Sequence, residues 1–238
     1  MMNEDSLLVI IHTAAFITSL MVARGYEITN IFEALKTTVG VEAADFANAA
    51  WTTARAAQIA RYWSGEEAPV GRRAQARALW DDKGITVRFD CRQTEPLVVS
   101  EKPRLEQKTI GLWDRDVCEL FITPETGEIK RYFEFEVAPT GEWIDLALKV
   151  RRGGRETDWH FRSGMTSAAR VSEGSVTLGM RVPWKAFGHK PRAGERWRCN
   201  LFRCVGRDPT RGYITWQPTL TPEPSFHVPE KFGWIAFK

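Results

Sequence analysis

The stretch GITVRFDC (84–91) decides the fold, because its apolar and polar side chains alternate along its whole length. Its odd-numbered positions from Ile85 to Cys91 are apolar, and its even-numbered positions from Thr86 to Asp90 are polar. A period of two is typical of a half-buried β-strand. The preceding stretch RAQARALW (73–80) is joined to it by the turn sequence DDKG (81–84), so the two stretches predict a β-hairpin.

The same alternation recurs towards the C-terminus, with turn residues every ten positions or so and no long helical pattern. The further stretches are DVCELFIT (116–123), KRYFEFEVA (130–138), WIDLALKV (143–150), SVTLGMRV (175–182), RWRCNLFRCV (196–205), YITWQ (213–217) and GWIAF (233–237). About nine short strands without intervening helices predict an all-β fold, an antiparallel β-sandwich with jelly-roll or Greek-key connections.

Two of these stretches also make a prediction about the faces of the sheet. In KRYFEFEVA, the apolar Phe133 and Phe135 alternate with Glu134 and Glu136, which we expect on a solvated face. In WIDLALKV, the apolar positions from Ile144 to Val150 are expected to point inward.

The N-terminal part of the chain reads differently. Residues 28–62 space their apolar side chains loosely at three and four, which predicts short helices or an irregular wrap before a sandwich over about 72–237. We expect residues 1–44 to be an extension and residues 45–238 to be one domain.

An apolar run, SLLVIIHTAAFITSLMVA (6–23), lies within this extension. The acidic MMNED (1–5) precedes it instead of the basic residues of a signal peptide, and no clear cleavage site follows. We therefore expect no membrane span and a cytoplasmic protein, with Met21 as an alternative start. A secreted or periplasmic location would follow if residues 6–23 acted as a signal.

Composition excludes several classes of protein. The 33 Lys and Arg against 30 Asp and Glu give a net charge of +3 without charge runs, so no nucleic-acid partner is expected. The four cysteines show no CxxC spacing and are expected to be free, buried thiols, and we predict no metal site. No calcium loop of the D-x-[DN]-x-[DN]-G type is present either. The 10 tryptophans outnumber the 4 tyrosines, which is unusual and points to flat apolar surfaces.

Catalytic motifs are scarce: the sequence contains no GxSxG, Walker A, HExxH or GxGxxG motif. Glu119 with Asp114 and Asp116, and Glu134 with Glu136, are carboxylate pairs of the kind that glycoside hydrolases use. A binding protein fits the sequence better than an enzyme. Activity associated with O-glycosyl hydrolysis stays open as an alternative.

Two stretches outside the strand cores have the chemistry of a sugar site. Sugars expose apolar C–H faces ringed by hydroxyls, so their sites combine flat aromatic rings with charged and amide groups. TIGLWDRDVCELF (109–121) contains Trp113 before Glu119, and TWQPTLTPEPSFHVPEKFG (215–233) contains Phe226 and His227 among four prolines. Those prolines restrict the loop before any ligand binds.

The order of several short motifs resembles carbohydrate-binding module family 9. They are W-x-x-D-x-x-E-L-F-I (113–122), F-H-x-P-E-K-F-G (226–233), ALWDDKGITVRF (78–89), A-P-T-G (138–141) and V-P-W (182–184). The resemblance covers about residues 45–238 and implies a β-sandwich similar to the haem- or sugar-binding DOMON domains. It also implies non-catalytic binding of mono- or oligosaccharides or polysaccharide chain ends, without a cofactor. The implied partners are a saccharide and separately encoded glycoside hydrolases.

The resemblance also assigns site residues. Trp113 matches the first aromatic wall and Glu119 a hydroxyl acceptor, whereas Phe226 stands where the family has a second tryptophan. Glu136 stands where the family has an arginine, so we expect Arg203 to compensate and His227 to line the rim. The alternative of a haem-binding DOMON-type electron-transfer domain would need an axial pair such as Met180 with His227.

Overall fold

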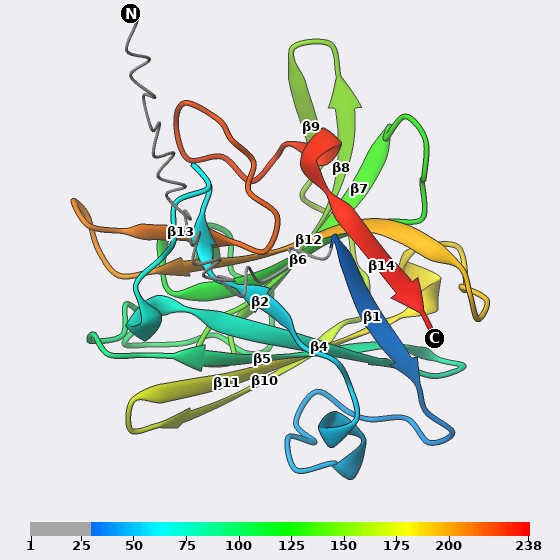
Figure 1. Ribbon diagram of the computed structural model, residues 1–238, viewed down its shortest axis with the longest axis horizontal. Helices are drawn as coiled ribbons and strands as arrows, with labels where there is room; N and C mark the ends of the chain where they lie inside the picture. Colours follow the sequence, from blue (N-terminus) through cyan, green and yellow to red (C-terminus); the bar gives the residue numbers. More distant parts are fainter. Residues whose placement is uncertain (1–29) are drawn as a thin grey trace, which may run out of the picture.

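The computed structural model describes residues 30–238, so the apolar run 6–23 and the alternative start at Met21 lie outside the described residues. The described chain is built of strands joined by turns and short 3₁₀ helices (Figure 1). The strands are β1 (Ile31–Lys36), β2 (Ala57–Ile59), β3 (Arg61–Tyr62), β4 (Ala74–Trp80), β5 (Gly84–Arg92), β6 (Val117–Thr123), β7 (Arg131–Val137), β8 (Trp143–Arg151), β9 (Gly154–Asp158), β10 (Thr166–Ser172), β11 (Ser175–Pro183), β12 (Arg196–Val205), β13 (Gly212–Thr215) and β14 (Gly233–Phe237). The 3₁₀ helices are η1 (Ala49–Thr52), η2 (Val70–Arg72), η3 (Leu112–Asp114), η4 (Trp184–Ala186) and η5 (Pro229–Lys231).

The strands form two packed layers, which confirms the predicted β-sandwich. One layer has the antiparallel order β10-β11-β5-β4, and the other has the antiparallel order β14-β12-β6-β7-β8-β9. In Figure 1 β4 and β5 lie below β12 and β6. The short strands extend these layers, β2 on β4 and β13 on β12, with β3 on β13.

Strand β1 joins the two layers at one edge. It pairs in parallel with β4 on one side and with β14 on the other. The expectation of a helical or irregular wrap over residues 28–62 is therefore wrong for β1, β2 and β3, and η1 is the one helical turn of residues 30–62. The apolar residues of IFEALK have spacings that suit both a helix and a strand. The segment forms a strand because β4 and β14 each offer it an unpaired sheet edge.

The inner core lies between the layers. The predicted hairpin is confirmed, and its apolar side chains at 85, 87, 89 and 91 are buried against those of β6, β7 and β12. Cys91, Cys118 and Cys199 belong to this core as free thiols, as the sequence indicated. Met180 is also fully buried there.

The DDKG turn is fixed by a buried ion pair. Asp81 Oδ1 accepts hydrogen bonds from the backbone nitrogens of Lys83, at 2.6 Å, and Gly84, at 3.1 Å, while Arg181 Nη2 donates to Oδ2 at 2.8 Å. Gly84 has no room for a side chain, because a Cβ there would lie 2.5 Å from the carbonyl oxygen of Val182. The turn therefore also anchors β11 beside β5.

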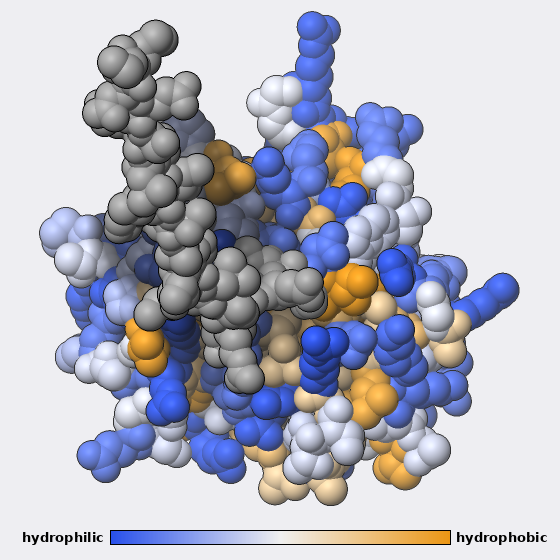
Figure 2. Space-filling view, viewed as in Figure 1, coloured by the Kyte–Doolittle hydropathy of each residue, from blue (hydrophilic) through white to orange (hydrophobic). Residues whose placement is uncertain are grey.

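On the face shown in Figure 2, the visible surface of the described residues is mostly hydrophilic, with scattered apolar side chains. Of its large apolar side chains that are exposed, one alone is aromatic: Trp159, with 42% of its surface exposed. None of the helices among residues 30–238 has the length and apolar character needed to span a membrane.

We predict that Phe32→Ala lowers the free energy of unfolding by about 3–5 kcal/mol, because it leaves a cavity where β1 bridges the layers. Phe32 is 1% exposed and its ring centroid lies 6.2 Å from that of Trp216. Urea denaturation measures the effect. Glu33→Ala, at the neighbouring half-buried position, is the control and should cost less than about 1 kcal/mol. Equal losses in both variants would show that the bridge contributes no special stability.

Candidate functional site

The second layer is buried on both of its faces. On its outer face, away from β4 and β5, a separate apolar cluster contains Phe121, Tyr132, Phe202, Phe226 and Phe232. The last two come from the loop between β13 and β14, which covers this face and appears in orange and red in Figure 1. This loop turns the outer face of the sheet into a second core with a cavity at its side.

The prediction that the apolar residues of β8 point inward is wrong. Leu148 pairs with Tyr132 and Leu146 pairs with Glu134, so these leucines lie on the outer face. Between them Ala147 belongs to the inner core, and the other inner position, just before Leu146, is Asp145, whose Oδ1 lies 2.6 Å from Lys108 Nζ and whose Oδ2 accepts a hydrogen bond from Ser163 Oγ at 2.7 Å. Alternation fixes which residues share a face, but when both faces are buried it does not fix which face is inner.

A cavity of about 380 Å³ opens on this outer face. Its lining combines aromatic, carboxylate and basic groups from the second layer with the C-terminal loop. The lining residues are Trp113, Asp114, Glu119, Glu134, Glu136, Leu146, Leu148, Arg155, Thr157, Trp159, Cys204, Tyr213, Pro224, Ser225, Phe226 and His227. Four of the predicted site residues (Trp113, Glu119, Phe226 and His227) are thus brought together.

Two tryptophans form the open side of the cavity. Trp113, on η3, and Trp159, just after β9, have ring centroids 6.2 Å apart and planes inclined at 43°. The guanidinium of Arg211 donates to the backbone oxygens of Trp113, at 2.6 Å, and Arg115, at 2.8 Å, which fixes η3 in place. The position of Trp113 is therefore set by hydrogen bonds to its backbone, and its indole remains half-buried.

The C-terminal loop contributes two ring side chains to the cavity, Phe226 and His227, and both pack against the sheet. Phe226 stacks on Phe202 with ring centroids 4.1 Å apart and planes at 11°, and is 8% exposed. His227 Nδ1 lies 3.0 Å from the hydroxyl of Tyr132. Burial disfavours the imidazolium and lowers the pKa of His227 to about 3, so this side chain is neutral at neutral pH. Phe226 lines the cavity with only a small part of its ring, because most of the ring is buried in the apolar cluster.

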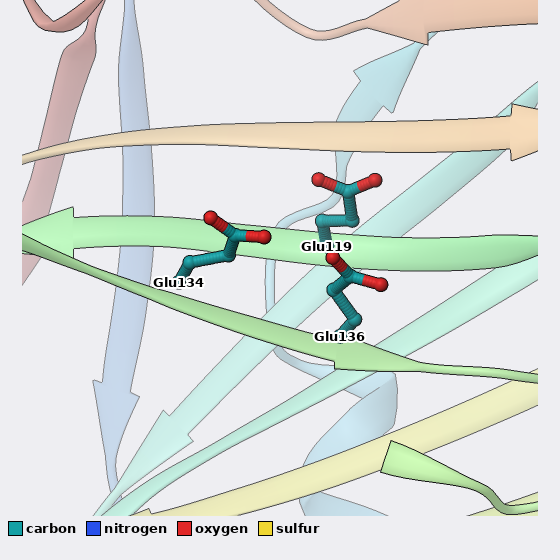
Figure 3. A group of neighbouring side chains, drawn as sticks. All are labelled: Glu119, Glu134 and Glu136. Carbon is teal, nitrogen blue, oxygen red and sulfur yellow. The ribbon is translucent and has the colours of Figure 1, made fainter. Parts of the chain in front are cut away.

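The cavity floor carries three carboxylates. Glu119 of β6 lies directly opposite Glu136 of β7, and Glu134 is two residues along the same strand, so all three share one face. Their exposures are 2%, 0% and 3%, respectively. Figure 3 shows the three side chains close to one another, and one oxygen from each lies within 4.8 Å of the others. The expectation of a solvated face for Glu134 and Glu136 is therefore wrong, because the C-terminal loop covers it.

These carboxylates are poorly compensated within the described chain. Both oxygens of Glu136 and Oε2 of Glu134 lack a hydrogen-bond partner there, and Glu119 has a weak donor in Cys204 Sγ at 3.5 Å. Burial, and then mutual repulsion, raises the pKa of Glu119 and Glu136 well above the usual range, and burial raises the pKa of Glu134. At this spacing and an effective dielectric constant of about 20, each ionised pair would repel by about 3.5 kcal/mol.

Arg203 does not line the cavity. It lies on the inner face of β12, where Nη1 donates to the carbonyl oxygens of Arg72 (2.8 Å), Arg73 (3.2 Å) and Arg92 (2.7 Å), and Nη2 donates to Gln93 Oε1. The expected compensation for Glu136 is thus wrong. Arg203 and Glu119 lie on opposite faces of their layer, since Cys204 shares the outer face with Glu119 and Arg203 precedes it.

Trp159 and Arg155 are the two cavity residues of most chemical interest among those that were not predicted from the sequence. Arg155 lies on β9, an exposed edge strand, and is the one guanidinium of the lining. The sequence did offer one indication of Trp159, since it directly follows the polar stretch GRETD (154–158). A large aromatic ring beside such a polar stretch is not expected to be part of the core. The haem alternative fails on geometry, because Met180 lies in the inner core and His227 belongs to the outer face.

We predict that Arg203→Ala lowers the free energy of unfolding by about 3 kcal/mol or more, because it removes the hydrogen bonds by which a buried guanidinium joins two chain segments. Urea denaturation measures it, with Arg207→Ala on the exposed loop after β12 as the control. The control should change stability by about 0.5 kcal/mol at most. A stable Arg203→Ala variant would contradict this structural role.

Comparisons with known proteins agree with this architecture. Among solved structures, the chain is similar to a proposed carbohydrate-binding protein from Bacteroides uniformis ATCC 8492, with 17% identity and a TM-score of 0.69 over 87% of this chain and 99% of that one. It is also similar to a carbohydrate-binding module family 9 from Caldicellulosiruptor kristjanssonii. The complex of that module with cellotriose gives 13% identity and a TM-score of 0.62 over 87% and 93% of the two chains. Its complex with glucose gives 13% and 0.61 over 87% and 95%.

A search of curated proteins finds no match. The model of one protein family, by contrast, matches residues 44–238, which is most of the chain and agrees with the motifs from Ala78 to Gly233. The chain belongs to the carbohydrate family 9 binding domain-like family.

Proposed function

We propose that the cavity on the outer face binds a mono- or oligosaccharide, or the end of a polysaccharide chain, without catalysis. The observation that carries this proposal is the pair Trp113 and Trp159 standing at the open side of a cavity whose floor is polar. Trp159 is exposed and Trp113 packs only partly against the apolar cluster, so the pair offers the flat apolar surface that the C–H face of a pyranose ring packs against.

The size and chemistry of the cavity support this proposal. A volume of about 380 Å³ lies within the usual range for small-molecule sites. The carboxylate oxygens of Glu119 and Glu136 can accept hydrogen bonds, and Arg155 can donate them. The lining can therefore bind a saccharide hydroxyl either as a donor or as an acceptor. The two complexes of the Caldicellulosiruptor module, with cellotriose and with glucose, add support from proteins of the same fold.

The proposed role follows from the absence of a catalytic motif in the sequence and from the family. A binding module without catalysis supports enzymes that act on the same polymer, so we propose separately encoded glycoside hydrolases as functional partners. A cytoplasmic location remains our expectation.

We predict that Trp113→Ala and Trp159→Ala each weaken saccharide binding at least tenfold, which corresponds to about 1.4 kcal/mol for the lost stacking surface. Calorimetric titration with glucose, cellobiose, xylobiose and a cellobiose reduced at its end measures the affinity. The melting temperature should change little, because both indoles are partly solvent-exposed.

Trp234→Ala is the matched control, since this half-buried tryptophan of β14 lies outside the cavity. It should leave the affinity unchanged. No heat with any saccharide, or equal weakening in Trp234→Ala, would contradict the proposed site. Release of nitrophenol from nitrophenyl glycosides by the wild-type protein would contradict its non-catalytic nature.

A further inference from the structure

We propose that Glu119, Glu134 and Glu136 hold a divalent cation at the floor of the cavity, with Ca²⁺ as the best fit. This metal site shares Glu119 and Glu136 with the proposed saccharide site, but binding of the cation itself does not require a saccharide.

The first observation is the geometry of the three carboxylates. Each offers an oxygen that lies within 4.8 Å of the oxygens of the other two. Ligands on one Ca²⁺ lie at roughly 2.3–2.6 Å from the ion, so two of them are at most about 4.6–5.2 Å apart. The cross-strand pair Glu119 and Glu136, together with Glu134, therefore meets the condition for sharing one ion.

The second observation is the lack of partners for buried polar atoms that line the cavity. Glu136 is 0% exposed and neither of its oxygens has a hydrogen-bond partner within the described chain, and the same holds for Oε2 of Glu134, which is 3% exposed. Buried polar atoms are nearly always paired in folded proteins, so an unpaired carboxylate facing a cavity points to a missing positive ligand. When one of the two carboxyls is protonated, Glu134 and Glu136 can hydrogen-bond to each other, but that bond accounts for one oxygen of each, so the second oxygen of Glu136 still has no partner.

The groups around the cluster do not supply the missing charge. The closest basic ring is His227, whose Nδ1 lies 4.0 Å from Glu134 Oε2 and 3.0 Å from the Tyr132 hydroxyl, so it is engaged elsewhere. Arg155 lines the same cavity but is exposed on an edge strand. A dication offsets the negative charge of these carboxylates, once they are ionised, better than one exposed guanidinium does.

The donor set selects the class of cation. All three ligands are carboxylate oxygens, which suit hard cations such as Ca²⁺ and Mg²⁺ more than Zn²⁺ or Cu²⁺. Ca²⁺ takes six to eight oxygen ligands in flexible geometry, and the open cavity above the carboxylates leaves room for the remaining ones. Mg²⁺ demands a near-ideal octahedron, which three side chains on two adjacent strands are not arranged to give.

The test uses Tb³⁺, which replaces Ca²⁺ and emits light when a nearby indole transfers energy to it. Trp113 and Trp159 line the same cavity and are the expected donors. Full-length protein freed of metal with a chelator is titrated with Tb³⁺ under tryptophan excitation. We expect saturable emission that excess Ca²⁺ abolishes. The same excess of Mg²⁺ should leave the emission unchanged. Absence of emission together with absence of Ca²⁺ heat in calorimetry overturns the site, and displacement by Mg²⁺ alone overturns the choice of Ca²⁺.

Variants assign the signal to the cluster. Glu136→Gln keeps the shape of the side chain and should weaken Tb³⁺ binding at least tenfold, whereas Glu67→Gln, at an exposed carboxylate paired with Arg61, should not. Equal binding in Glu136→Gln overturns the site. Ca²⁺ at a hundredfold excess over its Kd should raise the melting temperature of the wild type by about 5–10 °C, and no rise would contradict binding to the folded state. Glucose titrated in chelator separates the two proposals, since retained saccharide binding without any metal response overturns the metal site alone.

Discussion

The desolvation of three neighbouring carboxylates is the constraint on which the rest of this site depends. Moving each ionised carboxylate out of water costs several kcal/mol unless it is paired, and like charges directly opposite on two strands add to that cost. Glu119 and Glu136 form such a pair, on a sheet whose inner face is packed with apolar side chains. The apolar inner core therefore offsets the free-energy cost of burying these carboxylates. A buried polar group that destabilises the fold is expected where a ligand binds.

The second core explains how the site is built. Most antiparallel sheets leave one face in water, but here the loop between β13 and β14 covers part of the outer face with Phe226 and Phe232. Prolines at 218, 222, 224 and 229 restrict this loop, and the stacking of Phe226 on Phe202 holds it against β12. The cavity lies where this cover ends and η3 begins, so its walls come from segments more than a hundred residues apart in the sequence.

Strand alternation made much of the fold predictable, and the same rule limited the prediction of the site. The period of two located β4 to β8 and β11 to β14, but it carries no information about which face is inner when both are buried. Leu146 and Leu148 were therefore expected on the wrong side, and Glu134 and Glu136 were expected in water. β1 was missed because a short strand with a parallel partner on each side gains its stability from segments far along the chain.

The predicted site residues succeeded or failed for a similar reason. Trp113 and Glu119 are close in sequence and lie on one turn and the strand after it, so their proximity follows from local structure. Arg203 failed because one residue along β12 separates the cavity from the inner core, where its guanidinium joins the ends of β4 and β5. The pairing of β9 with β8 brings Trp159 to the site, and no local sequence pattern predicts this pairing.

The resemblance to family 9 places an arginine of the family where this chain has Glu136, and the structure gives that difference a physical meaning. An arginine opposite Glu119 would neutralise it and present donors to a ligand, whereas Glu136 adds a second acceptor and a second negative charge at the same point. The fold and the aromatic wall are thus compatible with family 9, but the cavity floor is more acidic than one in which an arginine faces Glu119. A ligand that satisfies this floor must bring hydrogen-bond donors or positive charge, so saccharide preference within the family does not transfer to this chain through its shared fold alone.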